Sequence, residues 1–267
     1  MISVDGIEIT PTIFPDKTSQ VWHIEPKYLR KMFSGPVTIR WDFESEGEVM
    51  HLLQLVTLIR STNREAIIKV KLSYLPYARQ DKDINNYATF ALHTFLSLMS
   101  LAVQELEVFD PHSTHLLDLY FGDNYKAVEP NLEISYAMNG YNGCSPDLIC
   151  YPDKGASTRY PCLNGVDSVY MEKTRDQATG KINGIELYGE VNGKSLLIVD
   201  DLCDGGRTFI EAAKVLRAAG ATEVNLYVSH GIFSHPLGVS ALHQAGIMKV
   251  YTRDGLVSDI NEKHPTD

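Results

Sequence analysis

Residues 195–221 read SLLIVDDLCDGGRTFIEAAKVLRAAGA. The apolar run at 196–199 is typical of a strand in a parallel sheet, because such a strand is covered on both faces. A glycine-containing loop follows, and then a helix whose residues Phe209, Ala213 and Leu216 share one apolar face before Gly220 ends it. The stretch therefore predicts a strand, loop and helix of an α/β fold.

Similar segments recur along the chain. Strands that run into loops are predicted within 66–78, 105–113, 147–157 and 223–234, and a helix is predicted at 86–102. This alternation indicates an α/β class with mostly parallel sheets flanked by helices. The length of 267 residues suits two domains. We place them at 1–130 and 131–267.

Composition and charge exclude several classes of protein. With 44% hydrophobic and 22% charged residues the chain is globular, not disordered. The net charge is −10 and no Lys/Arg run exceeds a pair, so nucleic acid is not expected as a partner. No apolar stretch approaches the ~18 residues that span a bilayer, and neither a secretory pattern nor a CxxC spacing is present. We expect a cytoplasmic protein with reduced thiols and no membrane contact.

Polar residues follow directly on four of the predicted strands. They are Arg79, Gln80 and Asp81, then Asp110 and His112, then Asp153, and finally Asp200 and Asp201. In open α/β sheets ligands bind outside the carboxyl ends of the strands, where such loops converge. The pattern predicts that these groups meet at one sheet edge, and ordinary solvated loop residues are the alternative.

Asp200 and Asp201 give the clearest chemical signal. Two adjacent carboxylates after a buried strand are costly to desolvate without partners, and a Mg²⁺ ion or the vicinal diol of a ribose would supply them. The loop that follows consists of Asp204, Gly205, Gly206, Arg207 and Thr208. Its free backbone N–H groups at a helix N-terminus suit an anion, although an Asp/Gly-rich turn with a helix cap would explain the same residues.

Several segments resemble those of one family. VDDLCDGGRT (199–208) resembles the PRPP-binding signature that type I phosphoribosyltransferases share with PRPP synthetases. SYLPYARQDK (73–82) and SHGIFSHP (229–236) resemble segments of PRPP synthetases. The resemblance runs from about residue 14 to 236. It implies two phosphoribosyltransferase-like domains and Mg²⁺-dependent transfer of the β,γ-pyrophosphoryl group of ATP to the C1 hydroxyl of a ribose, with release of AMP.

The resemblance also implies roles for individual residues. Arg79, Gln80 and Lys82 would bind ATP. So would Phe14 and Asp16 of FPDKTSQVW (14–22), which resembles a segment that reaches the ATP of a neighbouring subunit and so implies a homo-oligomer. FDPHS and YPDKGAS imply metal-linked roles for Asp110, His112 and Asp153. EKTRD (172–176) resembles a flexible catalytic loop, with Lys173 and Arg175 as its cations. Asp200, Asp201 and residues 204–208 would hold ribose and phosphate.

Two departures from the family pattern bear on the substrate. Gly205 and Arg207 stand where the family's phosphate loop carries Thr and Gly, and Thr18 stands where the adenine segment usually has Glu. The acceptor is therefore expected to be either ribose 5-phosphate or a 5′-extended ribose such as ADP-ribose. A PRPP-consuming phosphoribosyltransferase and an inactive regulatory relative of the synthetase remain as alternatives.

Overall fold

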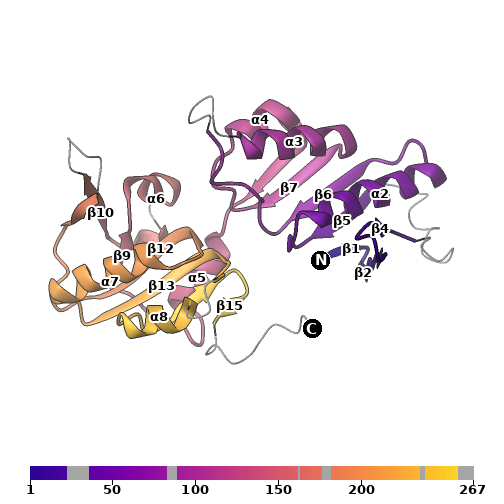
Figure 1. Cartoon of the computed structure of the whole chain (residues 1–267). Helices are drawn as coiled ribbons and strands as arrows, with labels where there is room; N and C mark the ends of the chain where they lie inside the picture. The colour runs from indigo at the N-terminus through magenta and orange to yellow at the C-terminus, as the bar shows by residue number, and fades with distance from the viewer. Residues whose placement is uncertain (23–35, 83–88, 162, 176–181, 235–237, 258–267) are drawn as a thin grey trace. The chain divides into compact units, whose positions relative to one another are not determined.

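The computed structural model describes residues 1–22, 36–82, 89–161, 163–175, 182–234 and 238–257 (Figure 1). The chain divides into two compact units, Met1–Glu129 and Pro130–Asp267. Each unit contains a sheet and its own buried core, so each is described by itself.

The first unit is built on a six-stranded sheet in the order β2-β1-β5-β6-β7-β8. Its parallel strands are β5 (Val37–Trp41), β6 (Ile68–Leu72), β7 (Glu105–Phe109) and β8 (Tyr125–Val128). The antiparallel edge is formed by β1 (Ile2–Val4) and β2 (Ile7–Glu8), and β3 (Thr12–Ile13) and β4 (Ser19–Gln20) form a separate hairpin. The helical elements are α2 (Gly47–Thr62), α3 (Ala91–Ala102), α4 (His115–Phe121) and η1 (Gly122–Asn124).

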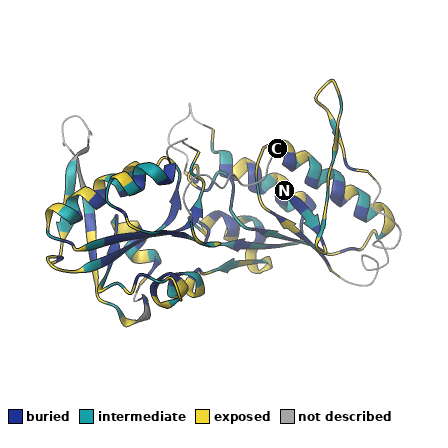
Figure 2. Cartoon of the chain, turned by 90° about the horizontal axis from the view of Figure 1, so that it is seen from below, coloured by how far each residue is buried: buried dark blue, intermediate teal, exposed yellow. Residues whose placement is uncertain are grey.

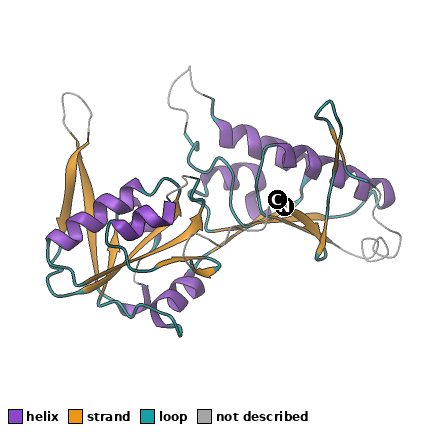
Figure 3. Ribbon diagram, turned by 60° about the horizontal axis from the view of Figure 1, so that its bottom comes forward, coloured by secondary structure: helices purple, strands orange, loops and turns teal. Residues whose placement is uncertain are grey.

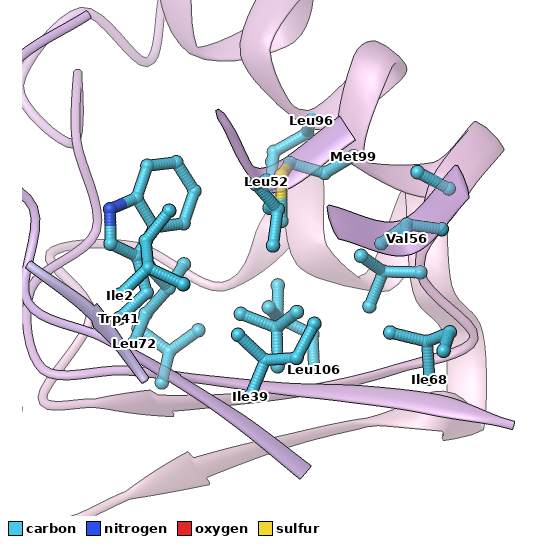
Figure 4. Packing of buried hydrophobic residues seen from close by; sticks show 14 of the residues in the cluster. Ile2, Ile39, Trp41, Leu52, Val56, Ile68, Leu72, Leu96, Met99 and Leu106 are labelled. Atoms are coloured by element: carbon cyan, nitrogen blue, oxygen red, sulfur yellow. The ribbon is translucent and has the colours of Figure 1, made fainter. Parts of the chain in front are cut away.

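Alternation along the strands explains the core of this unit. In β5, Val37, Ile39 and Trp41 are buried, whereas the residues between them are not. Successive side chains of a strand point to opposite faces, so one apolar face of the sheet results. Figure 4 shows Ile39 and Trp41 in one apolar cluster with Leu52 of α2 and Leu96 of α3.

Helix α3 begins later than the sequence pattern predicts. The predicted helix starts at residue 86, but Phe90 is not helical and the observed helix starts at Ala91; residues 86–88 lie outside the described part of the chain. The ring of Phe90 packs against His93 with the ring centres 5.3 Å apart, and the Leu92 N–H donates to the Gln80 carbonyl at 3.3 Å. The bond to Gln80 joins the first turn of the helix to the preceding loop, and periodicity does not reveal it.

The second unit contains a seven-stranded sheet in the order β11-β10-β9-β12-β13-β14-β15. Its strands are β9 (Leu148–Tyr151), β10 (Ser168–Arg175), β11 (Ile182–Tyr188), β12 (Ser195–Cys203), β13 (Glu223–Gly231), β14 (Val250–Thr252) and β15 (Gly255–Leu256). All pairs are parallel except β10–β11 and β14–β15. Its helical elements are α5 (Asn131–Asn139), α6 (Lys154–Arg159), η2 (Leu163–Gly165), α7 (Arg207–Ala218) and α8 (Gly238–Gln244).

Strand β12 is covered on both faces. Leu196 and Ile198 belong to a core with residues of α7 and α8, whereas Leu197 and Val199 belong to a core with residues of α5 and α6. Figures 2 and 3 show the buried strands of this sheet with helices packed against them. The predicted α/β class, with mostly parallel sheets flanked by helices, is thereby confirmed.

No helix in the described parts of the chain is long and apolar enough to cross a membrane.

Candidate active site

The predicted site residues lie at the carboxyl edges of two sheets, one in each unit. Asp81 and Asp110 follow β6 and β7, which are parallel neighbours in the first unit. Asp153 follows β9, and Asp200 lies near the end of the parallel β12 in the second. The expectation of a single sheet edge is therefore wrong, because the four segments divide between two separate sheets.

The loop after β6 presents the predicted ATP-binding residues. Arg79, Gln80 and Lys82 are exposed, whereas Asp81 between them is buried. Tyr77 anchors the turn from a left-handed backbone conformation, with φ of 61°, and its hydroxyl donates to Glu46 Oε1 at 2.8 Å. Burial, together with the Glu46 carboxylate, raises the pKa of Tyr77 to about 12. The Tyr77 hydroxyl is thus a permanent donor at neutral pH.

The loop after β7 carries the first pair of predicted metal-linked residues. Asp110 is buried and has a φ of 39°, a conformation that non-glycine residues rarely adopt. Its N–H donates to the Val128 carbonyl at 2.8 Å, which ties the end of β7 to the end of β8. His112 is half-buried two residues later.

The hairpin β3–β4 holds the predicted adenine-segment residues. Asp16 Oδ1 accepts hydrogen bonds from the Thr18 hydroxyl at 2.7 Å and the Thr18 N–H at 3.0 Å. The hydroxyl bond is the main reason that the pKa of Asp16 lies below its usual value. Thr18, one of the departures from the family pattern, therefore orients Asp16, and Phe14 beside it is half-buried.

The sequence pattern predicts that Asp200 and Asp201 follow the strand. In the structure they lie inside β12. The strand continues through Cys203 because it pairs with β13 as far as Gly231. Cys203 is accordingly fully buried at a strand end and does not lie in an accessible loop. The Asp201 N–H donates to Asp200 Oδ1 at 2.9 Å, and Arg159 Nη1 lies 2.8 Å from Asp201 Oδ2.

Three carboxylates are close enough in this part of the second unit to influence one another. The pKa of Asp200 is raised to about 8, mainly by burial, and the negative charges of Asp201 and Asp153 contribute to this rise. Asp153 caps α6 by accepting the Ala156 N–H at 3.0 Å. The cluster contains more acid than Arg159 balances, so it suits a bound cation or hydroxyl donors.

The loop 204–208 is joined to the end of β13. Asp204 Oδ1 accepts the Ser234 N–H at 3.0 Å, and the Cys203 carbonyl accepts the Ile232 N–H at 2.9 Å. Gly206 adopts a φ of 72° as the N-cap of α7, where a Cβ would lie 3.2 Å from Leu242. These contacts fix the N-terminus of a 12-residue helix, whose free N–H groups favour an anion.

The exposed part of the same loop carries the unusual residues. Gly205 and Arg207 are exposed, and Thr208 is half-buried. Nothing lies within 4 Å of a Cβ built on Gly205. The loop therefore has open space at the position where the family pattern places a threonine.

Lys173 and Arg175 lie in strand β10, paired with Ile185 and Ile182 of β11. The prediction of a loop at 172–176 is wrong for this part, because the antiparallel hairpin carries the backbone of both residues. The register shifts between Thr174 and Arg175, at the end of the paired region. Residues 176–181 and the 235–236 end of SHGIFSHP lie outside the described residues.

Three residues of this site have no predicted role in the sequence analysis. Arg159, Glu46 and Ser234 contact Asp201, Tyr77 and Asp204, respectively. A sequence feature that points to Arg159 is its position six residues after Asp153, an aspartate that can cap a helix. The other two contacts join segments about thirty residues apart, and local patterns do not reveal them.

The fold and these clusters define an α/β enzyme of the phosphoribosyltransferase-like class with an acidic ligand edge. A family model described as "Phosphoribosyl synthetase-associated domain" matches residues 156–263. The ribose-phosphate pyrophosphokinase of Pyrococcus abyssi is 31% identical over 217 residues, which cover 78% of this chain and 73% of that protein. The one from Sulfolobus acidocaldarius is 28% identical and covers 96% and 87%, respectively.

Among solved structures, phosphoribosylpyrophosphate synthetase from Mycobacterium smegmatis has a TM-score of 0.76 at 20% identity. The alignment covers 92% of this chain and 79% of that one, which supports the common fold. The chain belongs to the ribose-phosphate pyrophosphokinase family, whose members are pyrophosphoryl transferases.

We predict that the ligand-free protein becomes less stable as pH rises toward and through about 8. The pKa of Asp200 is raised from 3.8 to about 8 on folding. Between these pH values the folded state holds a proton that the unfolded state has released, so the free energy of unfolding falls as pH rises toward the pKa of the folded state. Asp200→Asn cannot ionise and should lose less stability over the same range. Thermal unfolding at several pH values measures both, and equal slopes in the two proteins would contradict the prediction.

Proposed function

We propose that this chain is a Mg²⁺-dependent pyrophosphokinase. It transfers the β,γ-pyrophosphoryl group of ATP to the C1 hydroxyl of ribose 5-phosphate, or of a 5′-extended ribose such as ADP-ribose, and releases AMP. The observation that carries the proposal is the carboxylate group of Asp153, Asp200 and Asp201, beside the N-terminus of α7. Relatives named ribose-phosphate pyrophosphokinase align over most of the chain, which favours this reaction over the consumption of PRPP by a transferase.

The carboxylates fit a magnesium ion. Among the described residues, no group of three or more His, Cys, Asp or Glu side chains is placed to hold a metal ion by itself. Mg²⁺ is commonly held by one or two carboxylates together with substrate phosphates and water, so a complete cage is not required. We assign metal-linked roles to Asp153 in the second unit and, separately, to Asp110 and His112 in the first. When bound, the ion would neutralise phosphate charge.

The first unit supplies the ATP-binding residues in this proposal. Arg79, Gln80 and Lys82 are exposed on a loop that the Tyr77–Glu46 hydrogen bond anchors, so they are accessible to a nucleotide. A guanidinium offers a planar pair of donors to phosphate oxygens, which makes Arg79 suited to the nucleotide. Phe14 and Asp16 on the β3–β4 hairpin are assigned to adenine.

The second unit supplies the acceptor site and the positive charge for transfer. Asp200 and Asp201 are assigned to ribose hydroxyls, and residues 204–208 to the 5′-phosphate. In phosphoryl-group transfer the charge spreads over phosphate oxygens, so catalysis depends on positioning and electrostatics. Lys173 and Arg175, near the end of β10, are assigned to stabilise that charge.

We predict that wild-type protein incubated with ATP, Mg²⁺ and ribose 5-phosphate releases AMP. Lys173→Ala or Arg175→Ala should lower kcat by at least about 10²-fold with a smaller change in KM, because groups that act in the transition state affect kcat. Steady-state AMP release at saturating ATP measures both parameters. Lys194→Ala is the control, since this exposed lysine precedes β12 at the opposite sheet edge.

An absence of AMP with every ribose phosphate would refute the pyrophosphokinase. A rise in KM alone for the Lys173 and Arg175 variants would instead refute their role in the transition state.

We predict that the active form is a homo-oligomer in which Phe14 and Asp16 reach the ATP of a neighbouring subunit. The support is the resemblance of residues 14–22, together with the exposure of Asp16 on a separate hairpin. Light scattering at the assay concentration measures the subunit count. A fully active monomer would contradict the prediction.

The proposal also concerns which ribose accepts the pyrophosphoryl group. The space beside Gly205 and the exposed Arg207 at the start of α7 leave room and charge beyond a 5′-phosphate. A diphosphate that continues outward would use both features. We therefore propose that ADP-ribose is accepted at least as well as ribose 5-phosphate.

We expect Gly205→Thr with Arg207→Gly to shift the preference toward ribose 5-phosphate. The added hydroxyl and Cβ would close the space, and the loss of the guanidinium would remove the outer charge. The measurement is kcat/KM for both acceptors in wild type and in the double variant. A wild-type preference for ribose 5-phosphate above about tenfold, roughly 1.4 kcal/mol, would exclude the extended acceptor.

A further inference from the structure

Helix α6 (Lys154–Arg159) joins two carboxylates of the candidate site. At its start, Asp153 Oδ1 accepts the Ala156 N–H at 3.0 Å. At its end, Arg159 Nη1 lies 2.8 Å from Asp201 Oδ2 on β12. One short helix therefore links the residue that follows β9 to the buried carboxylate of the neighbouring strand.

Polar contacts dominate the placement of this helix. Of its six residues, all of them described, only Ala156 is buried. Apolar packing therefore contributes little, because burial of one methyl group removes little surface from water. Just beyond the helix, the Tyr151 hydroxyl donates to the Tyr160 carbonyl, and both tyrosines are buried. The two ends of α6 are thus held more firmly than its middle.

We propose that Arg159 is a positioning residue for pyrophosphoryl transfer. Its ion pair holds the Asp201 carboxylate in one orientation, and through α6 it fixes the location of Asp153. The proposal rests on the proposed function, because it takes Asp201 to contact ribose and Asp153 to contact the metal.

The burial of the pair explains why an arginine is required. The Asp201 side chain is 4% exposed and that of Arg159 is 20% exposed. Removal of one partner from such a pair leaves an uncompensated charge, which the protein relieves by rotating or protonating the remaining group. Either response would take the Asp201 carboxylate away from a ribose hydroxyl. A lysine offers the charge without the planar fork of donors, so it would replace Arg159 only in part.

A matched control exists in the same unit. Arg217, in the last turn of α7, is also half-buried, and it donates to the carbonyls of Thr222 at 2.8 Å and Gly246 at 3.0 Å. Its contacts involve no carboxylate of the candidate site. Arg217→Met therefore removes a structural arginine of similar burial and should affect stability without affecting the reaction.

The experiment compares Arg159→Met, Arg159→Lys and Arg217→Met with wild type. We expect Arg159→Met to lower kcat by at least about 10²-fold, the scale of a misplaced catalytic group, and to weaken ribose 5-phosphate binding in calorimetry by more than about tenfold. Arg159→Lys should recover about tenfold of the lost kcat. Arg217→Met should lower the melting temperature yet keep kcat/KM within about threefold of wild type.

Wild-type kinetics in a folded Arg159→Met variant would overturn the proposal, as would equal losses in Arg159→Met and Arg217→Met. If Arg159→Met does not fold, Arg159→Lys decides: a drop in kcat at an unchanged melting temperature supports positioning, and an unchanged kcat overturns it. Absence of AMP from wild type would refute the proposed function alone. In that case calorimetry tests the role of Arg159. If ribose 5-phosphate binds wild type and Arg217→Met but not Arg159→Met, the positioning role is supported. If it binds all three equally, or does not bind wild type, the positioning role is overturned.

Discussion

The parallel pairing of β12 with β9 on one side and β13 on the other places the acidic groups of the second unit. Pairing with β13 runs from Ser195 to Cys203, beyond the run of four apolar residues at 196–199. The strand therefore carries Asp200 and Asp201 past this apolar run without a turn, into surroundings where water is scarce and charge is poorly screened. The N-terminus of α7 follows after three residues. Carboxylates and an anion-binding helix end are thus adjacent because one strand continues into one helix.

This placement has an electrostatic consequence. Asp201 is balanced by Arg159, whereas Asp200, beside the charges of Asp201 and Asp153, has a pKa of about 8 in the ligand-free protein. A carboxyl group with this pKa retains its proton until a cation or a hydroxyl donor replaces that proton as its partner. Ligand binding and proton release are therefore coupled. The chain's net charge of −10 does not conflict with the proposed phosphate substrates, because carboxylates would supply ligands for the metal ion that we propose.

The sequence predicts the fold class and the chemical character of the site better than it predicts where individual strands end. Leu196 to Val199 indicate a buried parallel strand because four consecutive apolar residues are typical of a strand covered on both faces. The end of that strand was misplaced because pairing with β13 is a tertiary interaction. Lys173 and Arg175 were assigned to a loop for the same reason, since their pairing with β11 depends on a hairpin register that composition does not encode. The Arg159 contact needs a helix and a strand to be placed together, which local patterns cannot do.

Backbone conformation suggests why these loops hold one shape. Tyr77, Asp110 and Phe233 are non-glycine residues with φ of 61°, 39° and 46°, and they lie in the loops after β6, β7 and β13. Each such conformation costs on the order of 1–3 kcal/mol and persists only where the surroundings enforce it. The enforcing contacts are the Glu46 bond to Tyr77, the Val128 bond to Asp110 and the Cys203 carbonyl that accepts the Phe233 N–H at 3.4 Å. A reaction that depends on positioning has a use for loops of this kind, because a loop already held in its working conformation loses little entropy when substrate binds.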